Sequence, residues 1–202
     1  MKTSDFNYHL PSERIAQMPA EPRDSSRLLV IDRQVDTTEH RIFRDILDYL
    51  QPNDLLVVNH TRVINARLSA KKADSGGKAE ILLLNQRNEA TWEAMVGGRR
   101  MTVGRRFVLE NRLEGEIVEV LDGSRRLVKF DRSVTEYLAE IGNAPLPPYI
   151  KEYTGDPERY QTVYSNAGKE GSSAAPTAGL HFTPELIGQI KAKGIDWAEV
   201  TL

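Results

Sequence analysis

Between residues 62 and 132 the sequence alternates short apolar stretches with turn residues, and this pattern restricts the fold more than any other feature. The turn signals SGG, GG and DG separate the stretches, and none of them has the 3.6-residue period of a helix. Six short strands without a helix predict a small antiparallel β-barrel. The stretches are RVINARL, KAEILLL, TWEAMV, RRFVLE, EGEIVEV and RRLVKF.

The residues before this region have a different pattern. Residues 28–31 are apolar and follow a polar loop, which predicts a strand. Apolar residues within 42–50 recur on one face at the helical period, and Pro52 follows them, so we expect a helix there. Residues 55–58, LLVV, predict a strand that is buried on both faces.

The residues after this region return to helices and strands. Ser133 to Glu136 form a capping-box pattern before a short helix, and ERYQTVY predicts another. Thr183 is the expected N-cap of a helix that begins with Pro184, and IDWAEVTL predicts a final strand. The predicted fold class is α/β: a discontinuous α/β domain with an inserted small antiparallel β-barrel domain. The expected boundaries are 1–61 and 133–202 for the α/β domain, incomplete at its C-terminus, and 62–132 for the barrel.

Composition excludes several classes of site. The chain has 202 residues and no cysteine, so disulfides, thiolate nucleophiles and cysteine-bound metals are excluded, and its four histidines are widely spaced, so we expect no metal site. Its apolar runs are far shorter than a membrane span, and we expect a cytoplasmic protein without a membrane partner. Residues 62–132 carry a net charge of +5 within a chain whose total is −2.

The stretch AAPTAGLHFT, residues 174–183, contains small residues immediately before the predicted final helix. Small side chains allow a ligand to approach the backbone, and a helix N-terminus favours negative charge. Gly179 offers conformational freedom, Thr177 a hydroxyl, and His181 a group that titrates near neutrality. The same residues also suit close packing between a helix and a strand, with His181 in the core, and the local pattern leaves both interpretations open.

Three further groups of polar residues have both a functional and a structural interpretation. Arg23 and Arg27 flank Asp24, Ser25 and Ser26 before a predicted strand, where two guanidiniums could clamp an anion or simply pair with the neighbouring carboxylate. Asn59-His60-Thr61-Arg62 follows the strand LLVV, a frequent place for binding residues. Arginines within residues 97–106 predict a phosphate-contacting edge of the barrel or a solvated face.

Five blocks of sequence, taken in order, carry a family resemblance. They are EPRDSSRLLVID, LLVVNHTRVINARL, LPPYIKE, RYQTVYS and AAPTAGLHFT. Together they closely resemble the S-adenosylmethionine:tRNA ribosyltransferase-isomerases of queuosine biosynthesis, and the likeness runs through essentially the whole chain. Members of this family continue well beyond the equivalent of Leu202, so the resemblance predicts that the chain is a C-terminally truncated form.

The resemblance implies an activity and its partners. The ribosyl part of S-adenosylmethionine is transferred and isomerised onto 7-aminomethyl-7-deazaguanine at the wobble position of a tRNA, giving epoxyqueuosine and releasing adenine and methionine. S-adenosylmethionine is then a consumed substrate, and no cofactor is expected. The alternative is a tRNA-binding fragment of that enzyme that is catalytically incomplete.

The matching blocks also imply site residues. We expect His181 to transfer a proton at the sulfonium-bearing ribose, with Thr177 beside it. Substrate positioning is expected from a larger set drawn from the same blocks. This set consists of Arg23, Asp24, Ser26, Asn59, Thr61, Arg62, Tyr149, Tyr160, Gln161, Pro176 and Gly179.

Overall fold

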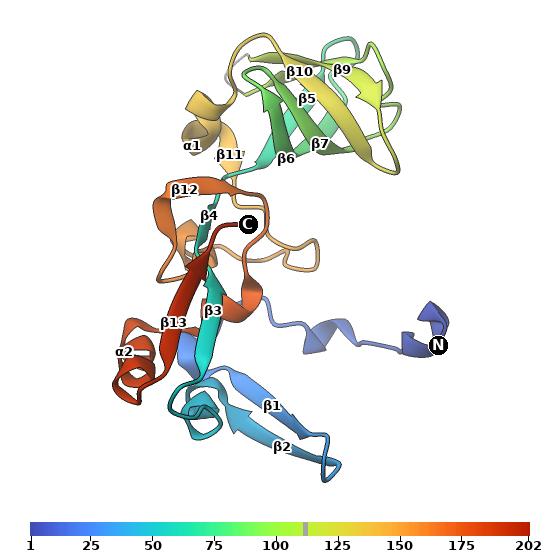
Figure 1. Ribbon diagram of the computed structural model, residues 1–202. Helices are drawn as coiled ribbons and strands as arrows, with labels where there is room; N and C mark the ends of the chain where they lie inside the picture. Colours follow the sequence, from blue (N-terminus) through green and yellow to red (C-terminus); the bar gives the residue numbers. More distant parts are fainter. Residues whose placement is uncertain (111–112) are drawn as a thin grey trace.

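The computed structural model describes residues 1–110 and 113–202, and their strands form one barrel and three strand pairs. Figure 1 shows the barrel at one end of the molecule, the β1–β2 hairpin at the other, and the β3–β13 pair running between them. The strands outside the barrel are β1 (Arg27–Asp32), β2 (Thr37–Ile42), β3 (Leu55–Asn59), β4 (Thr61–Val63), β12 (Asn166–Ser172) and β13 (Asp196–Val200).

The barrel is closed and antiparallel. Its sheet has the order β11-β5-β6-β7-β10-β9-β8, and the additional pairing of β5 with β8 joins the two ends. Among the strands of the described residues, closure leaves no free edge in the barrel wall. The strands are β5 (Arg67–Lys72), β6 (Lys78–Asn88), β7 (Thr91–Gly97), β8 (Arg106–Leu109), β9 (Glu114–Val120) and β10 (Arg125–Phe130), with β11 (Gly142–Asn143) added outside β5.

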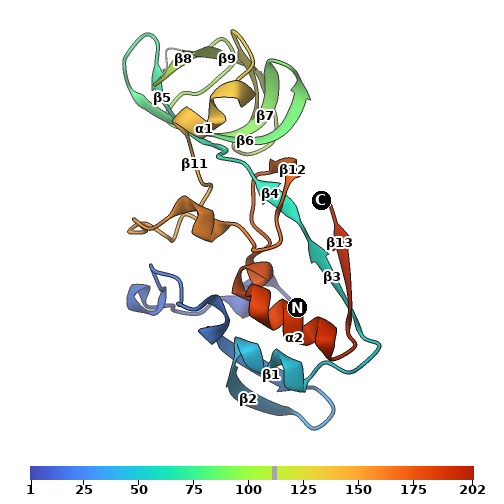
Figure 2. The same cartoon turned by 90° about the vertical axis from the view of Figure 1, so that its left-hand side faces the viewer.

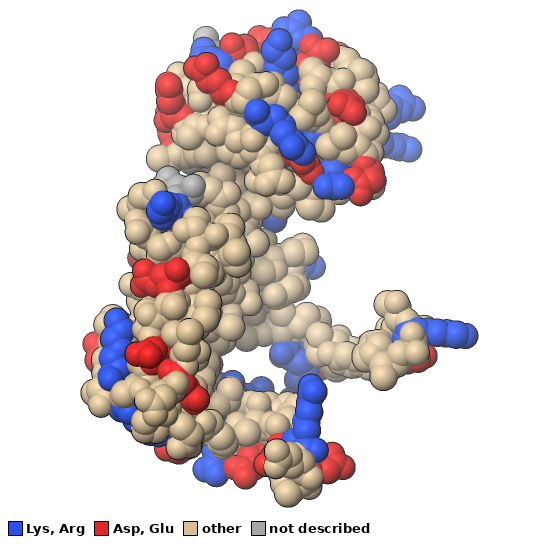
Figure 3. Space-filling model, in the orientation of Figure 1, with Lys and Arg blue, Asp and Glu red and all other residues tan. Residues whose placement is uncertain are grey.

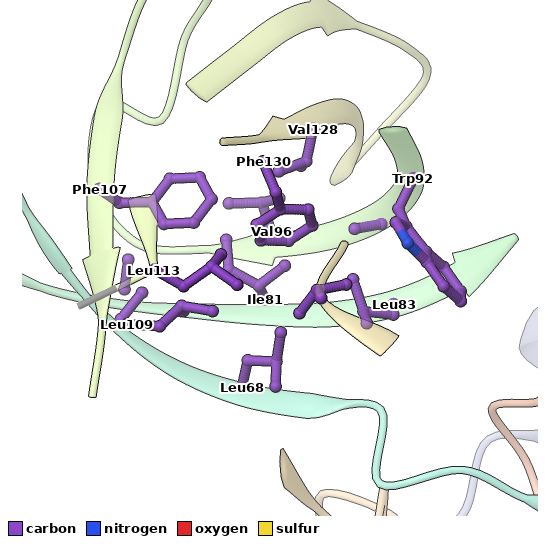
Figure 4. Close-up of a cluster of buried hydrophobic side chains, with 14 of the residues drawn as sticks. Leu68, Ile81, Leu83, Trp92, Val96, Phe107, Leu109, Leu113, Val128 and Phe130 are labelled. Atoms are coloured by element: carbon purple, nitrogen blue, oxygen red, sulfur yellow. The ribbon is translucent and has the colours of Figure 1, made fainter. Parts of the chain in front are cut away.

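The barrel interior is filled by apolar side chains. Phe107 and Phe130 are fully buried and meet edge to face, with ring centroids 6.0 Å apart. Figure 4 shows them pointing toward one another across the barrel, with Trp92 at its far side. Leu138 and Ile141 of helix α1 (Leu138–Ile141) belong to the same buried cluster, so this helix packs on the barrel. The predicted α/β fold class with a β-barrel is confirmed, whereas the exact domain boundaries stay a prediction.

The second core lies under helix α2 (Pro184–Ala192). Leu186 and Ile190 of α2 pack with Phe43, Phe182 and Ile195, close to the β3–β13 pair. Figure 2 shows α2 on one side of this strand pair. Strands β3 and β13 are parallel, as expected for strands joined through a helix.

Several sequence predictions are confirmed at the C-terminal end of the chain. Thr183 is the N-cap of α2, and its Oγ1 accepts a hydrogen bond of 3.1 Å from the backbone of Leu186. Pro184 is the first helical residue, and Gly194, with φ +84°, follows the end of the helix. The final strand forms as β13.

Other local predictions are wrong in detail. RVINARL is divided into two strands, β4 and β5, because β4 leaves the barrel and pairs in parallel with β12. The helix predicted over 42–50 is a 3₁₀ helix over Phe43–Asp48, preceded by the unpredicted strand β2. Strand β3 is buried on one face only, since Leu55 and Val57 are exposed.

The short helices are also tighter than predicted. The capping box at Ser133 does not form: the 3₁₀ helix there is Thr135–Tyr137, with Val134 at its N-cap and no side-chain cap. ERYQTVY contributes only to a 3₁₀ helix, Pro157–Tyr160, which Asp156 caps. The remaining 3₁₀ helices are Thr3–Phe6, Ser12–Arg14, Arg23–Ser25 and Thr177–His181.

Charged side chains are spread over the outer surface. Figure 3 shows Lys and Arg interleaved with Asp and Glu over the barrel, and a largely uncharged surface below it. No helix in the described ranges, 1–110 and 113–202, is long and apolar enough to span a membrane.

Candidate functional site

A cavity of about 590 Å³ lies where three segments far apart in the sequence come together. The segments are the N-terminal stretch around residues 16–27, the proline-rich stretch around 146–160, and the 3₁₀ helix at 177–181. Most of the lining residues are apolar or aromatic, and polar side chains lie among them, as is typical of small-molecule sites. The lining residues are Ala16, Gln17, Met18, Pro19, Ala20, Ser25, Ser26, Arg27, Leu146, Pro147, Tyr149, Ile150, Tyr153, Arg159, Tyr160, Thr177, Leu180 and His181.

Hydrogen bonds from one glutamine hold two of these segments together. Gln17 donates through Nε2 to the Tyr149 carbonyl at 3.0 Å, and its Oε1 accepts from the backbone of Lys151 at 2.8 Å. These bonds fasten the N-terminal stretch to the proline-rich stretch along one wall of the cavity. Gln17 could not be identified from the sequence, because a lone glutamine in a polar segment has no distinctive pattern.

Five of the predicted site residues line this cavity together. They are Ser26, Tyr149, Tyr160, Thr177 and His181. Tyr149 is exposed, whereas Tyr160 is half-buried, and burial raises the pKa of its phenol. The structure therefore brings together residues from four of the five sequence blocks.

His181 is half-buried at the end of its 3₁₀ helix and stacks at a tilt on Phe43, with ring centroids 5.0 Å apart. Burial lowers the pKa of His181, and the positive charge of Arg159 adds to this effect. A hydrogen bond to the Arg23 backbone acts in the opposite direction on the pKa. A lowered pKa keeps the imidazole neutral near pH 7, which is the form able to accept a proton.

The small residues of AAPTAGLHFT serve packing at Gly179. A Cβ there would lie 2.1 Å from Tyr164 Oη and 3.0 Å from Thr162 Cγ2. Gly179 is buried and its φ is not positive, so the expectation that it supplies conformational freedom is wrong: the position needs space instead. Residues 177–181 of the motif form their own 3₁₀ helix, and α2 begins at Pro184, directly after the motif, as predicted. Pro176 precedes this 3₁₀ helix and lies outside the cavity lining.

Arg23 and Gln161 are engaged with the backbone. Arg23 Nη1 donates to the carbonyls of Gln161 at 2.8 Å and Leu180 at 3.2 Å, and burial lowers the pKa of its guanidinium. The side-chain amide of Gln161 bonds both backbone groups of Val63, at 3.0 Å and 2.8 Å. These hydrogen bonds hold the backbone of the segments next to the cavity in place.

Asp24 lies beside Arg44, 3.3 Å from its guanidinium. The two arginines of the predicted clamp do not act as a pair, because Arg27 lines the cavity while Arg23 points to backbone carbonyls.

The predicted residues after β3 bond to one another and to the end of the chain. Asn59 Oδ1 accepts from the backbone and hydroxyl of Thr61, at 2.9 Å and 2.7 Å. Thr61 is buried, and its hydroxyl oxygen accepts a hydrogen bond of 2.9 Å from the backbone N–H of Leu202. Arg62 pairs with Glu158 at 2.5 Å. None of these three residues lines the cavity.

A second cavity of about 460 Å³ adjoins the first. Four residues line both cavities: Met18, Pro19, Tyr153 and Arg159. Sequence reasoning did not single out Arg159 or Tyr153, although Arg159 begins the block RYQTVYS and Tyr153 follows LPPYIKE. The remaining lining residues of the second cavity are Glu21, Arg23, Gly155, Asp156 and Glu158.

Curated proteins of known activity align with this chain over its whole length. The chain is 53% identical over 206 residues to the S-adenosylmethionine:tRNA ribosyltransferase-isomerase of Clostridioides difficile and 51% identical over 203 residues to that of Thermosipho africanus. Each match covers 100% of this chain but only 60% and 59% of the relative. The chain thus spans about 60% of the length of the curated relatives it matches.

A solved structure and a family model also match. The crystal structure of S-adenosylmethionine tRNA ribosyltransferase from Thermotoga maritima is 36% identical, covers 98% of this chain and 57% of that protein, and superposes with a TM-score of 0.40. The family model described as queuosine biosynthesis protein matches residues 3–202. The chain therefore belongs to the queuosine biosynthesis protein family.

Proposed function

We propose that the chain carries the S-adenosylmethionine site of a tRNA ribosyltransferase-isomerase. The relatives bear this name. The observation that carries the proposal is the 590 Å³ cavity, which His181, Thr177, Tyr149 and Tyr160 line together. Aromatic walls suit a purine, and half-burial suits a proton-transfer group. S-adenosylmethionine is a substrate here and no separate cofactor is invoked; the cytoplasmic location stays a prediction.

In the proposed reaction, the positive sulfonium acidifies the C5′ hydrogens of the ribose. A base removes one of them, the ring opens and adenine leaves with a proton. The amine of 7-aminomethyl-7-deazaguanine then attacks, and methionine is released as the ribosyl part isomerises. We assign the proton transfer to His181, because its lowered pKa leaves the imidazole neutral and able to accept a proton near pH 7.

The test is adenine release from S-adenosylmethionine incubated with the chain and tRNA that carries 7-aminomethyl-7-deazaguanine. We expect His181→Gln to reduce the rate by about 10²–10⁴-fold, the usual contribution of a general base. His40→Gln, on the exposed strand β2, is the matched control. Full adenine release by His181→Gln would show that His181 is not the proton-transfer group.

A second candidate function, a tRNA-binding fragment without complete catalysis, is supported by one end of the barrel. The basic rim consists of Lys71, Lys72, Lys78, Arg99 and Arg100, around the β5–β6 turn and the segment after β7. Lys72 donates to the Arg99 carbonyl and thereby links the two. Lys71 and Lys78 lie directly opposite each other on β5 and β6, an arrangement that destabilises a sheet when both carry like charge.

Pairing with carboxylates distinguishes the rim from other basic side chains of the barrel. Arg105, Arg106 and Arg125 form ion pairs with Asp74, Glu114 and Asp122. In the described part of the chain, no member of the basic rim does so. Uncompensated positive charge favours a polyanion such as tRNA.

Salt dependence of tRNA binding tests the rim. Removing two phosphate contacts with Lys71→Gln/Lys78→Gln should reduce the slope of log K against log salt by about 2, since each contact contributes roughly 0.9. Arg41→Gln, on the β1–β2 hairpin, removes a charge at the opposite end of the molecule and should leave the slope unchanged. tRNA binding without adenine release would favour the second function; adenine release would favour the first.

A further inference from the structure

The two adjoining cavities differ in charge. The lining of the 590 Å³ cavity contains Arg27, Arg159 and His181 but no carboxylate among the described residues. The lining of the 460 Å³ cavity contains Glu21, Asp156 and Glu158. A ligand that extends from one cavity into the other therefore passes from an aromatic, cationic surface to one that holds both signs of charge.

Arg159 lies at the boundary, because it lines both cavities. Its side chain is only 16% exposed. Nη2 donates to the Ala20 carbonyl at 2.7 Å, and this is the guanidinium's one hydrogen bond within residues 1–110 and 113–202. Nε is buried without a hydrogen-bond partner. A buried donor without an acceptor costs free energy, so this guanidinium has unused capacity for an anion.

The carboxylate nearest to Arg159 does not use that capacity. Glu21 Oε2 is 3.5 Å from Arg159 Nε, which is too long for a strong charge-assisted hydrogen bond, and the Glu21 side chain is 79% exposed. An exposed, loosely held ion pair contributes little and is readily replaced. Arg23, the other arginine of the second cavity, already donates to two backbone carbonyls.

We infer that the second cavity holds the α-amino-acid end of the sulfonium substrate, with its carboxylate bound by Arg159 and its ammonium beside Glu21 and Asp156. Glu158 is already paired with Arg62. This inference rests on the proposed function. The nucleoside end then occupies the first cavity, beside Tyr160 and His181. Guanidinium binds a carboxylate through two parallel hydrogen bonds, which fixes orientation as well as charge.

A tRNA phosphate would fit the same guanidinium less well. A phosphodiester brings negative charge only, and the carboxylates of Glu21 and Asp156 would repel it. An α-amino acid is zwitterionic, so the same carboxylates attract its ammonium while Arg159 binds its carboxylate. The mixed charge of this cavity therefore favours the amino acid.

Binding of two related ligands tests the inference. S-adenosylmethionine carries the amino-acid end, whereas 5′-methylthioadenosine lacks it, and calorimetry with the 202-residue chain gives both dissociation constants. We expect Arg159→Gln to weaken the binding of S-adenosylmethionine about 10–100-fold, the effect of losing a charged hydrogen-bonded pair. The dissociation constant of 5′-methylthioadenosine should change less than about twofold. Arg159→Lys keeps the positive charge but lacks the two parallel N–H donors. Its dissociation constant for S-adenosylmethionine should lie between those of the unaltered chain and of Arg159→Gln. Arg14→Gln is the control. Arg14 lies in the 3₁₀ helix Ser12–Arg14 and lines neither cavity, so its substitution should leave both dissociation constants unchanged.

Four other results would contradict either the assignment of Arg159, the amino-acid subsite or the proposed function. Equal weakening of both ligands would show that Arg159 only supports the fold, through Ala20, and would overturn the inference. Loss of tRNA binding with unchanged S-adenosylmethionine binding would assign the guanidinium to a phosphate and also overturn it. If the unaltered chain bound 5′-methylthioadenosine but not S-adenosylmethionine, the amino-acid subsite would be wrong; if it bound neither, the proposed function itself would fail.

Discussion

The barrel and the part of the chain that contains both cavities bury apolar surface in different ways. The barrel closes on itself through the β5–β8 pairing and encloses a large continuous core. Outside the barrel, the described residues form three separate strand pairs and a much smaller buried core under α2. Two-stranded sheets are marginally stable by themselves, so the cavity region depends on side-chain bridges such as those of Gln17 and Arg23.

The difference predicts that the two regions lose structure separately, with the cavity region first. A site built from connecting segments can rearrange around a substrate, whereas a closed barrel presents a rigid surface. The chain contains a reporter for each region, because its two tryptophans are Trp92 in the barrel and Trp197 on β13. Incorporation of 5-fluorotryptophan gives each region its own ¹⁹F resonance.

The largest expected effect comes from Phe107→Ala in the barrel core. Phe107 is fully buried against Phe130, and removal of such a ring costs about 3–5 kcal/mol. In a urea titration, the folded resonance of Trp92 should be lost at much lower urea, while that of Trp197 should keep its midpoint. A common midpoint for both resonances, with and without the substitution, would show one cooperative unit and break the comparison.

Gly179→Ala should have the next largest effect, and in the other region. The added Cβ overlaps Tyr164 Oη, so we expect a loss of about 1–3 kcal/mol, reported by Trp197, which lies 5.2 Å from the Tyr164 ring. Tyr164→Phe removes the overlapping oxygen and should recover part of the loss. Gly188→Ala in α2 is the matched control: nothing lies within 4 Å, and the exchange should stabilise the helix by about 0.5–1 kcal/mol. Equal effects of the two alanines would contradict the packing argument.

The sequence predicts much of the barrel and less of the cavity region for a physical reason. Barrel strands are set by alternation and turns, which are local, and five of the six predicted stretches correspond to barrel strands. The sixth, RVINARL, fails because β4 pairs with β12, about a hundred residues away in the chain. Helix α2 was predictable because its cap, Thr183 with Pro184, is also local.

The cavity depends on contacts that no local pattern encodes. His181 and Thr177 could be chosen from an unusual motif and from family resemblance, and they line the cavity with Tyr149 and Tyr160. Gln17 and Arg159 could not, because a polar residue acquires its role only when a distant segment folds against it. Asn59 and Thr61 show the opposite case, since their pattern is distinctive but their side chains bond to each other.

Loss of the α2 cap should have a smaller effect, again confined to the cavity region. Thr183→Ala removes the acceptor of the Leu186 N–H, which typically costs about 1 kcal/mol. The urea midpoint of the Trp197 resonance should fall and that of Trp92 should stay constant. Thr183→Ser retains the hydroxyl and should stay close to the unaltered chain; a loss as large as with alanine would mean that the methyl group, not the cap, matters.

The smallest expected effect is the pH dependence that His181 adds to the stability of the cavity region. Burial lowers the pKa of His181 in the folded chain below the ordinary value of 6.5. As the pH falls below that value, the unfolded chain takes up a proton that folded His181 resists, so unfolding becomes easier. The contribution is complete above pH 6.5 and is lost progressively as the pH falls toward the lowered pKa.

His181→Gln removes this contribution, so the difference in urea midpoint between the unaltered chain and the variant should shrink or reverse between pH 7.5 and 5.5. Other titrating groups affect both proteins alike and cancel in that difference. The change should appear in the Trp197 resonance, because His181 stacks on Phe43 in the core under α2, and not in Trp92. A pH-independent difference would mean that the imidazole is as well solvated as in the unfolded chain, which would also remove the reason for assigning it the role of a neutral base.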